Sequence, residues 1–170
     1  MNFPKKLVAV LEKISELSGR FISWLNFILI ISLVYEVISR FVFNKPTVWS
    51  YDISYMLGGT AFAIGAAWAL KNKSHVRVDI LYSRFSVRNK ALIDLVCSLL
   101  LFFPLVIMTM YVSINLAAFS WAMGERAISG YWNPPIYPLK TVIPITYALL
   151  LIQGIAEFIR NLYRVKGVEL

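Results

Sequence analysis

The sequence predicts an all-α integral membrane protein with four transmembrane helices and an N-terminal amphipathic interfacial helix. The first observation is composition: 59% of the 170 residues are apolar and the mean hydropathy is +0.68, whereas a soluble domain has about 45–50% apolar residues. The second is the presence of four apolar runs, each close to or above the ~20 residues that cross a bilayer as a helix. The third is the absence of the period-2 alternation that marks transmembrane barrel strands.

The four predicted spans belong to one membrane domain that covers residues 1–170. Helices are expected because a chain this apolar must satisfy its backbone hydrogen bonds internally within a bilayer. The third run is long enough to tilt or to extend past the hydrocarbon. The spans are expected at about residues 21–43, 53–70, 92–122 and 142–162.

The segment before the first span, residues 1–18, has a different pattern. Its apolar residues recur every three or four positions and charged residues fill the other face, which is typical of a helix lying on a membrane surface. We expect this helix to join the first span near Ser18–Gly19. A soluble extension docked on a partner is the alternative. The apolar positions are Phe3, Leu7, Val10, Leu11, Ile14 and Leu17.

Basic residues are distributed unequally between the two ends of the predicted spans. Most of the 17 Lys and Arg residues fall at the two termini and in the connection after the second span. The positive-inside rule therefore puts both termini in the cytoplasm, with an aromatic belt at the opposite interface. Cations near a span end contact anionic phospholipid head groups. The candidates for lipid-interface contact are Lys5, Lys6, Lys13, Arg20, Lys71, Lys73 and Trp132.

The residue inventory excludes several classes of function. The net charge of +8 does not indicate nucleic-acid binding, because the cations lie at the ends of apolar runs and not on one soluble face. The single cysteine, Cys97, rules out an intrachain disulfide and a cysteine metal site, and we expect it to be a small buried apolar residue. The single histidine, His75, rules out a bis-histidine haem anchor and a histidine-rich metal site. We therefore predict no enzyme activity, catalytic residue, cofactor or metal site in this chain.

Few charged residues fall within the predicted spans. Glu36 and Arg40 are four residues apart in the first span, so they share a helix face and are expected to pair. A proton-coupled exporter that uses Glu36 as its intramembrane carboxylate is the competing interpretation. The second span is rich in small residues, and Gly58 and Gly65 would allow close approach of another helix.

The segment KNKSHVRVDI, residues 71–80, follows the second span. His75 and Asp79 have the i, i+4 spacing of a possible proton relay. Because the topology makes this segment the exit of a span, we interpret His75, Arg77 and Asp79 as a structural turn or a subunit contact.

Four motifs in this order resemble the small membrane subunit (Q-type) of tripartite ATP-independent periplasmic (TRAP) transporters. They are SRFVFN with Arg40, TVWSYDISY with Trp49 and Asp52, GGTAFAIGAAWAL, and SHVRVDIL with His75 and Asp79. The family often has two acidic residues after the tryptophan, whereas this chain has Tyr51 followed by Asp52. The resemblance runs over most of the chain and is densest from Val34 to Asp79.

The resemblance implies a partner subunit in the bacterial inner membrane. A periplasmic protein would capture an organic acid, and a large permease subunit would move it by a sodium-coupled elevator motion. This chain would brace the large subunit without binding substrate, and Na⁺ would bind to the large subunit. We further expect Glu36, Arg40, Trp49 and Asp52 to form a packing network between the first two spans. A membrane anchor for a redox or signalling complex is a second alternative.

Overall fold

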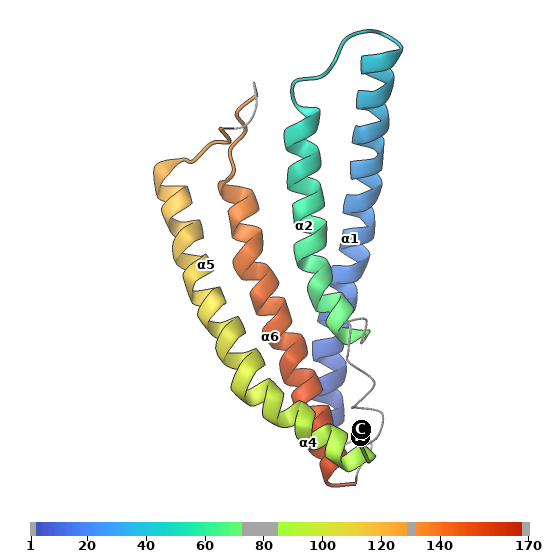
Figure 1. Cartoon of the computed structure of the whole chain (residues 1–170), viewed down its shortest axis with the longest axis vertical. Helices are drawn as coiled ribbons and strands as arrows, with labels where there is room; N and C mark the ends of the chain where they lie inside the picture. The colour runs from blue at the N-terminus through green and yellow to red at the C-terminus, as the bar shows by residue number, and fades with distance from the viewer. Residues whose placement is uncertain (1–2, 73–84, 129–131, 168–170) are drawn as a thin grey trace.

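The protein folds as a bundle of long helices, seen in a computed structural model (Figure 1). The structure describes residues 3–72, 85–128 and 132–167. Four helical stretches of the described chain are long and apolar enough to cross a membrane. They confirm the predicted all-α membrane fold. The predicted sites His75, Arg77 and Asp79, and the predicted lipid contact Lys73, lie outside the described residues.

The first span is part of one continuous helix, α1, which runs from Phe3 to Phe41. At 1.5 Å per residue its 39 residues extend for about 58 Å, roughly twice the hydrocarbon thickness of a bilayer. We predicted a change of element near Ser18–Gly19, but the helix continues without a break. Gly19 lies inside it against the ring of Trp68. The surface position of residues 3–18 stays a prediction.

The second span is α2, Ser50–Lys71, and the last is α6, Tyr137–Val165. Between them come α4 (Val87–Cys97), a five-residue π-helix η1 (Ser98–Phe102) and α5 (Phe103–Met123), which form one curved unit (Figure 1). The π-helix precedes Pro104, whose ring would collide with the carbonyl of Leu100 in a regular α-helix. The wider turn, in which the Phe103 amide bonds the Ser98 carbonyl, accommodates the proline.

Helix α6 is the centre of the bundle, because it contacts α1, α2, α4, η1 and α5. Its buried positions are small or polar, including Gln153, Gly154 and Asn161. Large apolar side chains face outward instead: Phe62 is 86% exposed and Met108 is 73% exposed. This inside-out distribution is expected of helices that pack through small residues and face lipid or partner subunits with their large ones. Cys97, expected to be buried, is also exposed.

Candidate functional site

The bundle has two chemically different ends. We call the end that carries residues 42–49 and 124–136 the loop end, and the end that carries both chain termini the terminal end. The loop end is uppermost in Figure 1. There α1 and α2 are joined by one short connection and α5 and α6 by another.

Glu36 organises the first of these connections, residues 42–49. Its Oε1 accepts from Arg40 Nε at 2.9 Å and from Nη2 at 2.5 Å. Its Oε2 accepts from the Thr47 backbone amide at 3.0 Å and from the Thr47 hydroxyl. The expected Glu36–Arg40 pair is therefore present, and the same carboxylate also holds the connection against the end of α1. A carboxylate with these contacts is a poor candidate for the carrier of an exporter.

Trp49 completes this region by stacking on Tyr35, with ring centroids 5.7 Å apart and an interplanar angle of 24°. The connection turns at Asn44, whose φ is 53°, a left-handed conformation that asparagine tolerates better than most residues. Ser39 donates to the Lys45 carbonyl at 2.5 Å. The structure thus places Glu36, Arg40 and Trp49 in one region.

The second connection, residues 124–136, is anchored to the start of α6. The Ala127 amide donates to the Pro134 carbonyl at 2.9 Å and the Ile136 amide to the Glu125 carbonyl at 3.0 Å, forming a small antiparallel bridge. Lys140 Nζ lies 2.5 Å from Glu125 Oε2. This ammonium group, with the Ser120 hydroxyl, holds the pKa of Glu125 below its usual value against the opposing effect of partial burial.

Trp132, the predicted aromatic contact of this interface, is 45% exposed. Trp121 donates its indole N–H to the Thr141 hydroxyl at 2.8 Å. The ring centroids of Trp121 and Tyr137 are 4.2 Å apart. Aromatic rings with one polar edge are typical of a membrane–water interface. The geometry of the loop end is therefore compatible with the predicted belt.

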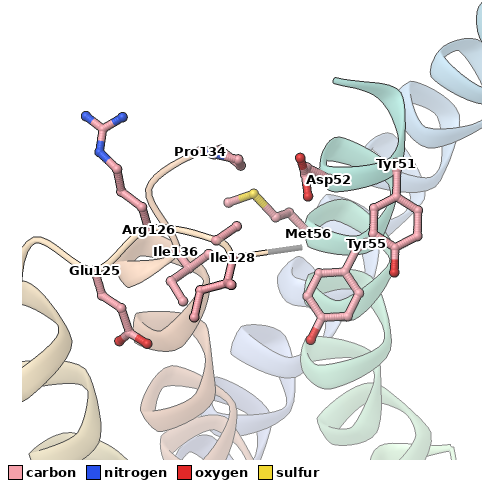
Figure 2. Close-up of a pocket in the computed structure, with 10 residues that line it drawn as sticks. Tyr51, Asp52, Tyr55, Met56, Glu125, Arg126, Ile128, Pro134 and Ile136 are labelled. Carbon is pink, nitrogen blue, oxygen red and sulfur yellow. The ribbon is translucent and has the colours of Figure 1, made fainter. Parts of the chain in front are cut away.

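Asp52 is in the first turn of α2 and lines a cavity of about 370 Å³ between that helix and residues 125–128, 134 and 136 (Figure 2). Asp52 is 4% exposed, and its Oδ2 has no hydrogen-bond partner among the described residues. Figure 2 shows its carboxylate directed toward the loop, while the Arg126 guanidinium is directed away from it. The cavity is the strongest candidate site, because a buried carboxylate oxygen without a partner among the described residues belongs to its lining.

The terminal end is joined by contacts between distant parts of the sequence. Ser15 of α1 donates to Gln153 of α6 at 2.7 Å, and both side chains are fully buried. Arg160 bonds Glu12 of α1 and also bonds Glu157, one turn away, at 3.2 Å. The three-residue spacing of Glu157 and Arg160 predicts their pair. The Ser15–Gln153 and Arg160–Glu12 contacts were not predicted, because sequence spacing reveals only pairs within one helix.

Lys71 supplies a further contact at the terminal end: its Nζ lies 3.3 Å from Glu16 of α1. We predicted Lys71 and Arg20 as lipid contacts, and Arg20 bonds the same glutamate at 3.2 Å. Lys5, Lys6 and Lys13 are exposed on α1. Lys71 therefore has a role within the bundle that its position in the sequence did not reveal.

The glycines predicted to allow close packing, Gly58 and Gly65, leave enough space for a methyl group. A Cβ atom at Gly58 or Gly65 would lie 3.9 Å from the nearest side chain, which belongs to α1 in both cases. The tight approaches occur at Gly19 and Gly154, where a Cβ would lie 2.3 Å from Trp68 and Phe102, respectively. Both glycines are isolated in sequence, so the small-residue pattern did not identify them.

The described residues contain no group of three or more His, Cys, Asp or Glu side chains that could hold a metal ion. The sequence profile of a family described as tripartite ATP-independent periplasmic transporters, DctQ component, matches residues 29–164. A search of curated proteins gave no significant match. The family match includes the loop end and all of α2, α5 and the cavity, but it begins after the amphipathic part of α1.

Proposed function

Because the chain belongs to the DctQ family of TRAP transporter components, we propose that it is the small membrane subunit that braces a large permease subunit. The permease would import an organic acid by a sodium-coupled elevator motion, and a periplasmic protein would deliver the substrate. The chain is a multi-pass membrane protein. We propose the bacterial inner membrane as its location, with both termini in the cytoplasm.

The uncharged centre of the four spans carries this proposal. The sequence has no Asp, Glu, Lys, Arg or His in residues 21–35, 53–70, 95–124 and 141–156. A path for ions or organic acids through a membrane normally requires ionisable groups near the middle of the bilayer. A body without such groups is suited to support a carrier rather than to act as one.

The contacts between helices support a bracing role. An elevator requires one part that stays fixed while another moves through the membrane. Here α1 is bonded to α6 through Ser15–Gln153 and Arg160–Glu12, and to α2 through Glu16–Lys71. The bundle is thus held together by polar contacts in addition to packing, which favours a stiff frame.

Reconstitution in liposomes tests the proposal. The chain and the large subunit would be reconstituted together and separately, with the binding protein outside and an inward sodium gradient. Sialic acid, a C4-dicarboxylate and a 2-oxo acid are suitable labelled substrates. We expect sodium-dependent uptake only when both subunits are present. Transport by this chain alone, driven by a pH gradient, would instead favour the exporter that uses Glu36. A haem or quinone that copurifies with the chain would favour the membrane-anchor alternative.

The outward face of α1 allows a test of how the subunit is held in the membrane. Val10 and Leu17 belong to the predicted apolar stripe, and they are 60% and 68% exposed, whereas Val8 and Ser15 face the bundle. Replacing Val10 and Leu17 by Lys should weaken membrane anchoring or complex formation and reduce uptake. The unfolding of the isolated subunit should change little, because neither side chain packs inside. Unchanged uptake and copurification would contradict the role of this face.

A further inference from the structure

The carboxylate of Asp52 is buried, but one of its oxygens has no hydrogen-bond donor among the described residues. Asp52 is 4% exposed, and this oxygen is Oδ2. A buried carboxylate without a compensating charge or donor is expensive to maintain. The amide groups at the start of α2 provide some stabilisation, because a negative charge in the first turn interacts favourably with the helix dipole. That interaction does not occupy the cavity in front of the carboxylate.

Four described cations lie near the loop end, Arg40, Lys45, Arg126 and Lys140, and none of them bonds Asp52 Oδ2. Lys140 is engaged by Glu125 at 2.5 Å, and Arg40 is engaged by Glu36. Arg126 lines the same cavity, but its guanidinium is directed away from Asp52 (Figure 2). Oδ2 of Asp52 thus has no compensating group within the described part of the chain.

The walls of the cavity fit a long cationic side chain. Met56, Pro134 and Ile136 provide an apolar lining, and the cavity holds about 370 Å³. Lysine and arginine have apolar stems that pack on such walls and charged heads that seek a carboxylate. A bare metal ion fits less well, since hard cations prefer six or more oxygen ligands and the described residues supply no group of three acidic, His or Cys side chains.

The position of the cavity indicates which partner supplies the cation. Tyr51 and Tyr55 line it from the side of α2 and are 67% and 65% exposed. Ile128, also in the lining, is 99% exposed. Large apolar and aromatic side chains beside a span are suited to contact with a neighbouring membrane helix. A soluble partner would instead favour a polar rim.

We propose that this cavity receives a lysine or arginine side chain of the large membrane subunit, which pairs with Asp52. The inference rests on the proposed function, because it requires a large subunit beside α2. It adds a specific contact at the loop end to the general bracing role.

Asp52→Asn separates this role from a purely structural one. The substitution keeps the shape of the side chain but removes its charge. Affinity for the large subunit should fall at least about tenfold, because a desolvated charge pair loses one partner. The isolated chain should be equally or more stable, since a buried unpaired charge is relieved. The measurements are quantitative copurification of the two subunits and detergent unfolding of the small subunit alone. Glu16→Gln, which removes the same charge at the terminal end, should leave copurification unchanged.

Charge reversal identifies the partner. Asp52→Lys should abolish copurification, and suppressor substitutions of a Lys or Arg by Asp or Glu in the large subunit should restore it. Suppressors in the binding protein or at Arg126 would overturn the proposal, as would full affinity of Asp52→Asn or a loss of stability in the isolated chain. If the wild-type subunits themselves do not copurify, both this inference and the proposed function fail. If only the Asp52 variants behave like wild type, the inference alone fails.

Discussion

The terminal end and the loop end of the bundle use their polar residues differently. At the terminal end, Ser15 bonds Gln153 and Glu12 bonds Arg160, so residues that are far apart in sequence join α1 to α6. At the loop end, Glu36 bonds Thr47 and Glu125 bonds Lys140, so each connection is fixed to its own pair of helices. The two pairs, α1–α2 and α5–α6, have the Asp52 cavity between them at this end.

This difference indicates which end stabilises the isolated chain and which end can contribute to binding a partner. Polar contacts between distant helices stabilise a subunit whether or not a partner is bound. Contacts within each connection fix the local backbone shape. The described residues of these connections provide no hydrogen-bond partner for Asp52 Oδ2, in the cavity between the α1–α2 pair and the α5–α6 pair. The terminal end should therefore determine the stability of the isolated chain, and the loop end should contribute more to assembly.

The largest effect is expected from Arg160→Gln. The variant leaves Glu12 and Glu157, which are 22% and 15% exposed, without their shared cation. We expect the free energy of unfolding to fall by about 2 kcal/mol, below the range for fully buried pairs because the site is partly exposed. Unfolding in mixed detergent micelles measures the change. Arg20→Gln is the matched control, since Arg20 is 75% exposed and such pairs contribute little. Equal effects of the two substitutions would show that the contacts of Arg160 contribute no more to stability than an exposed ion pair within one helix.

A smaller effect is expected from Gly19→Ala. The new Cβ would lie 2.3 Å from Trp68 Cδ1 and 2.9 Å from Cγ, so the indole must move. Overpacking of this kind, offset by the better helix propensity of alanine, should lower the free energy of unfolding by about 1 kcal/mol. The control is Gly59→Ala, where the nearest atom is 3.9 Å away. If both variants unfold alike, the close approach of α1 and α2 is not a determinant of stability.

Exchange of the charges at Glu36 and Arg40 tests the loop end. A simple ion pair would tolerate the exchange better than either single reversal. The structure predicts otherwise, because an arginine at position 36 cannot accept from the Thr47 amide, now 3.0 Å from Glu36 Oε2. The double variant should show faster protease cleavage within residues 42–49 than Arg40→Gln, with a small decrease in unfolding temperature. Cleavage at the wild-type rate would show that the ion pair alone fixes the connection.

The smallest effect concerns pH. The pKa of Glu125 is lowered in the folded chain, chiefly by Lys140. Its contribution to stability is therefore complete above the ordinary glutamate pKa of about 4.3 and is lost as pH falls through the lowered folded value. The wild type should lose slightly more stability between about pH 5 and 3 than Glu125→Gln. Thermal unfolding of both proteins over this range provides the measurement, and identical slopes would contradict the prediction.

The helical membrane fold was predictable from the sequence because four apolar runs leave few other solutions. The Glu36–Arg40 contact was predictable for a similar reason, since four-residue spacing places both side chains on one face. The limits of α1 were harder to predict. Gly19 resembles a helix boundary in sequence, but it lies inside a continuous helix because the packing of Trp68 needs the space.

The candidate site was only partly predictable. Asp52 was identified by its position after Trp49, and we expected it to join Glu36 and Arg40 in one network. The structure places Asp52 at a cavity lined by residues 125–128, 134 and 136, a neighbourhood that this expectation did not include. Which face of α2 meets the second connection depends on how α2 packs against α6. A single sequence contains no information on that rotation, and the same limit concealed the contacts of Arg160 with Glu12 and of Gln153 with Ser15.

The unbroken helix α1 has a mechanical consequence. A hinge between residues 3–18 and the rest of the helix would let the two sides of the membrane move independently. Here one rod of 39 residues is fastened to α6 near one end and carries the Glu36 region at the other. A force applied to the loop end by a docking protein would therefore be transmitted as a tilt of the whole rod. The two faces of the membrane would then experience the same change in the tilt angle of α1.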